Sequence, residues 1–146
     1  MIKSLMLEPG SPFPDLVLHS LDNQAEESLH GLKKKKHSLL LLIQGQDARV
    51  LALLQEFEKR RELFNWYEAP LIAVFASSQD VPQPWSLSAA KAWALAPGSV
   101  LAPGLAWGCG YLISRHKTLF SVYPDLAAID LDQVERDLMV WEARHC

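Results

Sequence analysis

Cysteine is scarce in this chain, and its placement disfavours most thiol and metal chemistry. The 146 residues contain 2 cysteines, Cys109 and Cys146. They form neither a CxxC pair nor a spacing suited to metal ligands, so a dithiol redox motif and a disulfide framework are both disfavoured. The 5 histidines are scattered along the chain, with no pair at helical i, i+4 spacing. We therefore expect no bound metal and no other cofactor.

Long apolar runs and excess positive charge are also missing. The longest aliphatic run, Leu39–Ile43, is far too short to cross a bilayer, and residues 1–14 lack the apolar core of a signal peptide. The formal net charge of −3 gives no electrostatic reason to expect nucleic acid or an anionic membrane as a partner. These absences predict a cytoplasmic protein, in a reducing compartment that suits its free cysteines.

The composition fits one α/β domain spanning residues 1–146. Apolar residues make up 49% of the chain and charged residues 21%, which is ordinary for a globular domain. A chain of this length buries a sizeable core without disulfides or metals. Neither an internal repeat nor an interdomain linker is visible in the sequence.

The most regular stretch is residues 37–76. HSLLLLIQ (37–44) predicts a strand buried on both faces, because a half-buried strand would alternate apolar and polar residues. Residues 48–67 place apolar side chains on one helical face and carry Glu–Arg pairs at helical spacing. This pattern predicts an amphipathic helix of about five turns. APLIAVFAS (69–77) returns to an apolar run, so the whole stretch predicts a parallel βαβ unit.

Hairpin signals flank this unit on both sides. Residues 15–24 and 25–32 predict an N-terminal β-hairpin, with a tight turn at Gly31. GYLISRHKTLFSVYPD (110–125) predicts a second antiparallel hairpin that turns at Arg115-His116-Lys117.

The remaining segments are a terminal helix and an irregular region. Asp130 occupies an N-cap position, with Gln133 at the capping-box position, before an amphipathic helix over 131–144. Residues 77–110 are punctuated by proline and glycine. Within them, residues 86–95 fit a helix and a strand equally well.

Two surface features have competing interpretations. Lys33–Lys36 is a run of four positive charges, interpreted either as a solvated loop beside a hydrophobic strand or as a patch for an anion or acidic partner. No aromatic residues interleave with the lysines, which disfavours nucleic acid further. Trp85, Trp93 and Trp107 cannot all be buried against one small sheet, so we expect part of their surface to form a homodimer contact. The alternative is that they cover a second layer of a monomer.

The predicted order of elements, βαβ followed by ββα with an added N-terminal hairpin, is that of the thioredoxin fold, a central mixed sheet with helices on both faces. PGSPFPDLVLHSLDNQ resembles the opening of peroxiredoxins, and HSLLLLIQG resembles the strand that leads to their active site. YLISRHKTLFSVY resembles the Phe-Leu-Ile-Asp-Arg hairpin of the same family. Over nearly its whole length the chain thus resembles the peroxiredoxin branch (alkyl hydroperoxide reductases and thiol-specific antioxidants).

The resemblance implies a peroxidatic cysteine at the start of the helix after the 37–44 strand, where the helix dipole and a nearby arginine stabilise a thiolate. The stretch here is Gln44-Gly45-Gln46-Asp47-Ala48-Arg49, which contains no sulfur, proline or threonine. Four residues therefore mark a degenerate active-site position: Gln46, Asp47, Ala48 and Arg49. Asp47 is the predicted helix cap. At the hairpin turn, Lys117 replaces the family's usual glycine, which would suit a positive φ.

Two classes of function follow from this comparison. The first is a non-catalytic thioredoxin-fold protein that binds a protein or small-molecule ligand, or serves in assembly. The second is a divergent thiol oxidoreductase or peroxidase that uses Cys109, which by the resemblance lies near the loop facing the active-site helix. An inert core cysteine is the alternative interpretation of Cys109. The reactivity of its thiol in the folded protein distinguishes the two classes.

Overall fold

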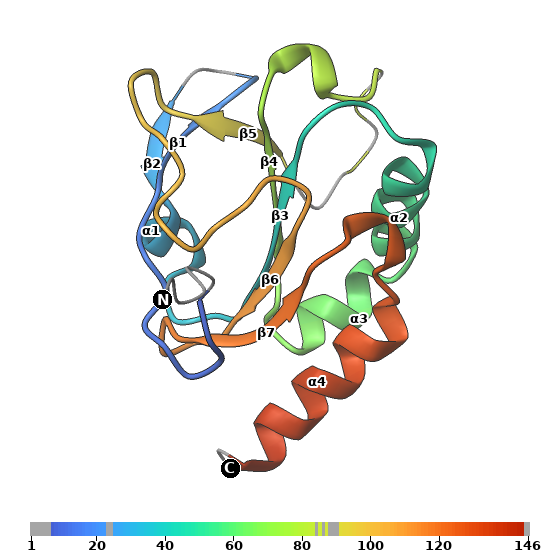
Figure 1. Cartoon of the computed structure of the whole chain (residues 1–146). Helices are drawn as coiled ribbons and strands as arrows, with labels where there is room; N and C mark the ends of the chain where they lie inside the picture. Colours follow the sequence, from blue (N-terminus) through green and yellow to red (C-terminus); the bar gives the residue numbers. More distant parts are fainter. Residues whose placement is uncertain (1–6, 23–24, 84, 86, 88–90, 145–146) are drawn as a thin grey trace, which may run out of the picture.

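The computed structural model describes residues 7–22, 25–83, 85, 87 and 91–144. Its elements in chain order are β1 (Val17–Ser20), β2 (Glu26–Ser28), α1 (Leu29–Lys33), β3 (Ser38–Ile43), α2 (Ala48–Lys59), α3 (Arg61–Trp66), β4 (Leu71–Phe75), the 3-10 turn η1 (Ser78–Asp80), β5 (Ala92–Leu95), β6 (Gly110–Ile113), β7 (Leu119–Tyr123), the 3-10 turn η2 (Leu126–Ala128) and α4 (Leu131–Arg144). The strands form one seven-stranded mixed sheet in the order β2-β1-β5-β4-β3-β6-β7 (Figure 1).

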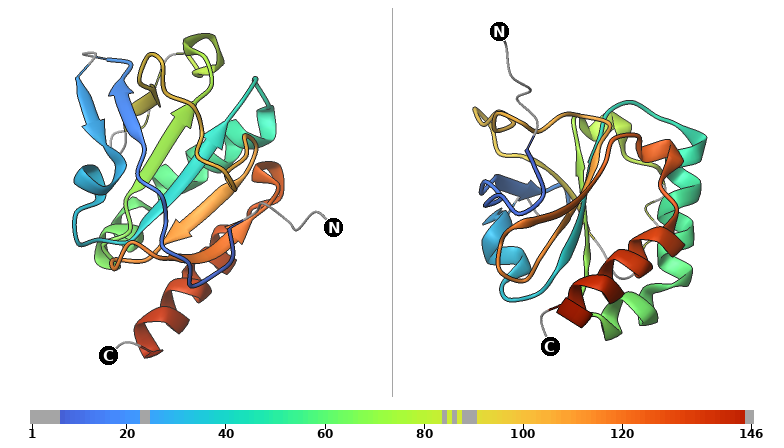
Figure 2. Two further views of the ribbon diagram at one scale, coloured as in Figure 1. Left: turned by 60° about the vertical axis from the view of Figure 1, so that its left-hand side comes forward. Right: turned by 60° about the horizontal axis from the view of Figure 1, so that its bottom comes forward.

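Helices lie on both faces of this sheet, as predicted, although unequally. Figure 2 shows α2, α3 and α4 together on one face and the short α1 on the other. Each face carries its own cluster of buried apolar side chains. None of the helices in the described ranges is long and apolar enough to span a membrane.

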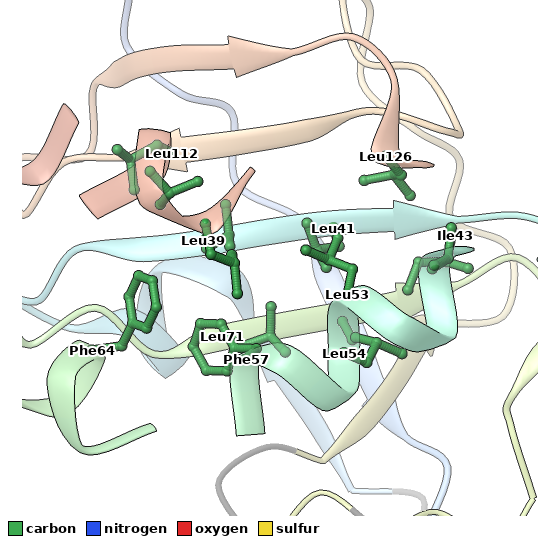
Figure 3. Packing of buried hydrophobic residues seen from close by; sticks show 14 of the residues in the cluster. Leu39, Leu41, Ile43, Leu53, Leu54, Phe57, Phe64, Leu71, Leu112 and Leu126 are labelled. Carbon is green, nitrogen blue, oxygen red and sulfur yellow. The ribbon is translucent and has the colours of Figure 1, made fainter. Parts of the chain in front are cut away.

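The predicted βαβ unit is confirmed in the centre of the sheet. β3 and β4 pair in parallel, with Leu39 opposite Leu71, and every residue of β3 is buried. Leu39 and Leu41 belong to the cluster on the face that α2 covers (Figure 3), whereas Leu40 joins the cluster on the other face. Both faces of the strand are therefore covered, which explains the unbroken aliphatic run.

The prediction of one continuous helix over 48–67 is wrong. Arg60 leaves helical geometry, with φ of −104° and ψ of 15°, so α2 ends at Lys59 and α3 begins at Arg61. The Arg60 guanidinium pairs with both Glu56 and Asp132, the latter at the start of α4. The break therefore coincides with a contact to a distant helix.

The N-terminal hairpin is confirmed, but its predicted turn at Gly31 is wrong. β1 and β2 pair antiparallel, with His19 opposite Glu26. The chain then enters α1, because Ser28 caps that helix: its Oγ accepts the backbone N–H of Gly31 at 2.9 Å. A serine that satisfies a helix N-terminus favours helix over a continued strand.

The C-terminal half follows the prediction closely. β6 pairs antiparallel with both β3 and β7, and Lys117 in the turn has φ of +65°. Asp130 caps α4 through its Oδ1, which accepts the backbone N–H of Asp132 at 2.9 Å. Gln133 does not complete a capping box, since its Nε2 donates to Asp137 instead.

The region left open by the sequence contributes a strand. β5 pairs in parallel with β4 and antiparallel with β1; residues 86 and 88–90 lie outside the described ranges. Trp93 is buried on β5, while Trp85 and Trp107 pack against the clusters on opposite faces of the sheet. These three side chains therefore divide between the two faces, and a homodimer contact through them stays a prediction.

Candidate functional site at the carboxyl ends of β3 and β4

A pocket of about 510 Å³ opens at the sheet edge where the parallel strands β3 and β4 end. Its volume is in the range of small-molecule sites, and ligands bind preferentially beyond the carboxyl ends of parallel strands. Its buried lining is apolar, and its polar lining residues are exposed or half-buried. The apolar side chains include Ile43, Val50, Leu54, Phe75 and Val81, and the polar ones are Gln46, Asp47, Ser78, Gln79, Asp80 and Gln83.

The turn from β3 into α2 forms one wall of this pocket. Gly45 has φ of +77°, in the left-handed region that side chains rarely adopt, so glycine allows the sharp turn. Gln46 then donates its Nε2 hydrogen to the carbonyl oxygen of Gln79 at 2.8 Å. This bond connects the β3–α2 turn to the segment after β4, which forms the opposite wall.

Asp47 is the N-cap of α2, as predicted. Its Oδ1 accepts the backbone N–H of Arg49 at 2.8 Å, and its Oδ2 lies 3.2 Å from the Arg49 guanidinium. Hydrogen bonds from the side chain and then the backbone of Arg49 lower the pKa of Asp47. A fixed carboxylate therefore occupies the positive end of the helix, where its charge is favoured.

Replacing Asp47 with alanine should lower the urea midpoint of unfolding modestly without changing the m value, because the first turn of α2 loses its acceptor. Asp47→Ser retains a capping oxygen and should keep most of the stability. Equilibrium unfolding followed by circular dichroism measures both variants. Equal losses in the two variants would contradict a capping role.

Cys109 does not line this pocket. Its residue is 7% exposed and belongs to the cluster on the face opposite α2, together with Leu42 and Tyr111. Its thiol donates to the carbonyl oxygen of Pro124, with Sγ 3.5 Å from that oxygen. The structure thus brings Gln46, Asp47 and Ala48 together at the pocket and places Cys109 on the other face. Its catalytic role stays a prediction, and Cys146 lies outside the described residues.

The described histidines do not assemble a metal centre. Across the described ranges, no group of three or more His, Cys, Asp or Glu side chains is placed to hold a metal ion. His37 instead belongs to a polar network: its Nε2 lies 3.0 Å from Glu142 Oε1, and its Nδ1 accepts the backbone N–H of Arg115. Burial is the main cause that lowers the pKa of His37. This arrangement fixes the start of β3 against α4.

The second wall of the pocket, which residues 78–83 provide, is not among the residues predicted from the sequence. These residues carry no motif of their own. The rule that parallel strands end at a common edge would have placed them beside residues 44–49, because the βαβ unit was predicted.

Comparison with known proteins identifies the architecture. No family model and no curated protein matches the sequence. Among solved structures, a yeast mitochondrial 1-Cys peroxiredoxin matches with a TM-score of 0.70 and 11% identity, over 94% of this chain and 78% of that chain. The chain has a thioredoxin-like fold. A thiol peroxidase from Chromobacterium violaceum (TM-score 0.64, 17% identity, 99% and 93% coverage) supports the same assignment.

The structural neighbours of this thioredoxin-like domain are not confined to peroxidases. BsSco, a member of the Sco family of cytochrome c oxidase assembly proteins, matches with a TM-score of 0.62 and 11% identity, over 92% of this chain and 96% of that chain. Identities this low establish the fold and leave the activity open. The function of this thioredoxin-like domain has to be argued from its own site.

Proposed function

We propose that this chain is a peroxiredoxin-like protein that binds a ligand and does not reduce peroxides. The observation that carries the proposal is Asp47, a carboxylate that fills the N-terminal end of α2 beside the pocket. A peroxidase cycle requires a thiolate at that end of the helix, where the dipole favours the attacking sulfur. No cysteine precedes Cys109 in the sequence.

The pocket supports a binding role and restricts the ligand chemistry. Its interior is apolar, and its rim combines glutamine amides with the carboxylates of Asp47 and Asp80. This arrangement favours an uncharged or cationic small molecule, or a protein segment with an apolar side chain. The two carboxylates disfavour an anionic ligand. A homodimer and a cytoplasmic location remain part of the proposal.

The competing function, a thiol oxidoreductase that uses Cys109, has weaker support. A reactive cysteine is normally an accessible thiolate beside positive charge or a helix N-terminus. Cys109 is buried among apolar side chains, and its thiol hydrogen is donated to a backbone carbonyl.

Assays of peroxide reduction test the proposal. With thioredoxin, glutathione or dithiothreitol as donor, the protein should consume hydrogen peroxide and alkyl hydroperoxides no faster than buffer does. Cys109→Ser should leave that background unchanged, because the thiol lies on the other face of the sheet from the pocket. Peroxide consumption is the readout, with an active peroxiredoxin as the positive control.

Peroxide turnover well above background that disappears in Cys109→Ser would overturn the binding proposal. The reactive sulfur would then lie just before β6 instead of at the helix N-terminus, and the thiol-oxidoreductase function would replace the binding function.

A further inference from the structure

A second pocket, lined by basic side chains, lies at the opposite end of β3. It has a volume of about 730 Å³ and is lined by Lys34, Lys35, Arg115, His116 and Lys117. The two lysines follow α1, and the other three residues form the turn between β6 and β7. Antiparallel pairing of β6 with β3, which places Ser38 opposite Ile113, brings these two segments side by side. The pocket is therefore distinct from the candidate site beyond Ile43.

Three lysines of this basic pocket have no acidic partner among the residues that the structure describes. Arg115 pairs with Glu142 and, at 3.4 Å, with Glu68. The ion pairs formed in the described part of the chain include none for Lys34, Lys35 or Lys117. The pocket thus carries excess positive charge although the whole chain has a net charge of −3.

Lys33, the residue before Lys34, is buried and lies close enough to Lys117 and Arg115 to be repelled by them. Burial lowers the pKa of Lys33 to about 8, and repulsion from Lys117 and Arg115 adds to the effect. Like charges held together destabilise one another unless an anion offsets them.

The two segments of the pocket are held in fixed relation. The Lys33 ammonium donates to the carbonyl oxygens of Lys36, at 2.7 Å, and of Ser114, at 2.8 Å, so it joins the lysine turn to the hairpin. Lys34 and Lys117 adopt φ of +52° and +65°, where glycine would avoid strain. Keeping lysine at both positions costs conformational energy and retains two charges at the pocket.

We propose that this basic pocket binds a small soluble polyanion that carries phosphate groups, such as an inorganic polyphosphate or a phosphate ester with two or more negative charges. Lysine ammonium groups bind phosphate oxygens as point charges, and three of them match a multiply charged ligand. The five lining residues belong to two adjacent turns. An extended nucleic acid or membrane surface would call for a basic stripe longer than two turns.

Calorimetric titration of the full chain with inorganic tripolyphosphate tests this proposal. At about 50 mM NaCl we expect saturable binding with a Kd below about 1 mM, weakening as salt is raised. The variant Lys34→Asn/Lys35→Gln/Lys117→Asn should bind at least about tenfold more weakly. Asparagine is used at the two positive-φ positions because it adopts a positive φ more often than most other side chains.

A matched control separates the pocket from the overall charge. Lys59→Gln/Lys91→Gln/Arg136→Gln removes the same number of charges from exposed positions elsewhere and should leave the Kd within a factor of about two. The single variant Lys35→Gln, at an exposed position with no positive φ, should weaken binding measurably and covers the case in which the triple variant fails to fold. Asp47→Ala should have no effect, because Asp47 lies at the other end of β3.

Three results would overturn the inference. The first is no saturable binding at millimolar tripolyphosphate. The second is equal weakening in the pocket and control variants, which would indicate general charge attraction. The third is tighter binding of an acidic peptide such as oligo-glutamate than of tripolyphosphate, which would assign the pocket to an acidic protein segment.

Discussion

In the folded protein, Cys109 should react with iodoacetamide at least about 100-fold more slowly than the same thiol does in urea. Its residue is 7% exposed and packs with Leu42 and Tyr111. The thiol also donates to the carbonyl oxygen of Pro124, at an Sγ–O distance of 3.5 Å. The reagent therefore has to wait for a local opening of the sheet around β6. Openings of core strands approach the cost of global unfolding, which accounts for the size of the expected effect.

In a Cys146→Ser variant, Cys109 is the one remaining thiol. Mass spectrometry of timed samples gives the alkylation rate of that thiol. Free cysteine at the same pH calibrates the reagent. A native rate at or above that of free cysteine would mean that Cys109 is accessible and held as a thiolate. The thiol-oxidoreductase function would then be favoured over binding.

The elements that the sequence predicted correctly are those with a strong local signal. The aliphatic run of β3 has no alternation, the β6–β7 turn is flanked by apolar strands, and Asp130 caps the helix that spans Leu131–Arg144. Each of these signals acts within a few residues and does not depend on the rest of the fold.

The elements that were wrong depend on competing contacts. The break between α2 and α3 contains no proline or glycine that would predict it. Instead, the Arg60 guanidinium pairs with Asp132, 72 residues away in the chain. At α1, the hydroxyl of Ser28 favours a helix where the pattern of residues 25–32 predicted a strand.

Only one part of the candidate site could be predicted from the sequence, for a similar reason. Residues 46–49 were located from the strand–helix joint, which is local. The face on which Cys109 lies depends on register, since a shift of one residue moves a side chain to the other face of a sheet. Pairing of Leu41 with Gly110 places Cys109 next to Leu42, in the cluster opposite α2. Sequence alone does not determine that register.

The stability of the protein relative to its Lys33→Met variant should increase by about 2 kcal/mol between pH 7 and pH 10. Lys33 is fully buried, and burial, followed by repulsion from Lys117 and Arg115, lowers its pKa from 10.5 to about 8. Above pH 8 the folded chain releases this proton while the unfolded chain still binds it. Raising the pH through this window therefore favours the folded state, and methionine removes the effect.

Urea unfolding of both proteins across this pH range gives the difference in free energy. The difference between the two free energies of unfolding isolates Lys33, because groups that titrate in both proteins cancel. Burial raises the pKa of Tyr111 to about 12, which opposes folding at the most alkaline pH but contributes equally to both proteins. Lys91→Met, at an exposed position, should show a difference from the native chain that does not vary with pH. A Lys33→Met difference that is equally flat would show that the amine of Lys33 keeps its ordinary pKa despite its burial.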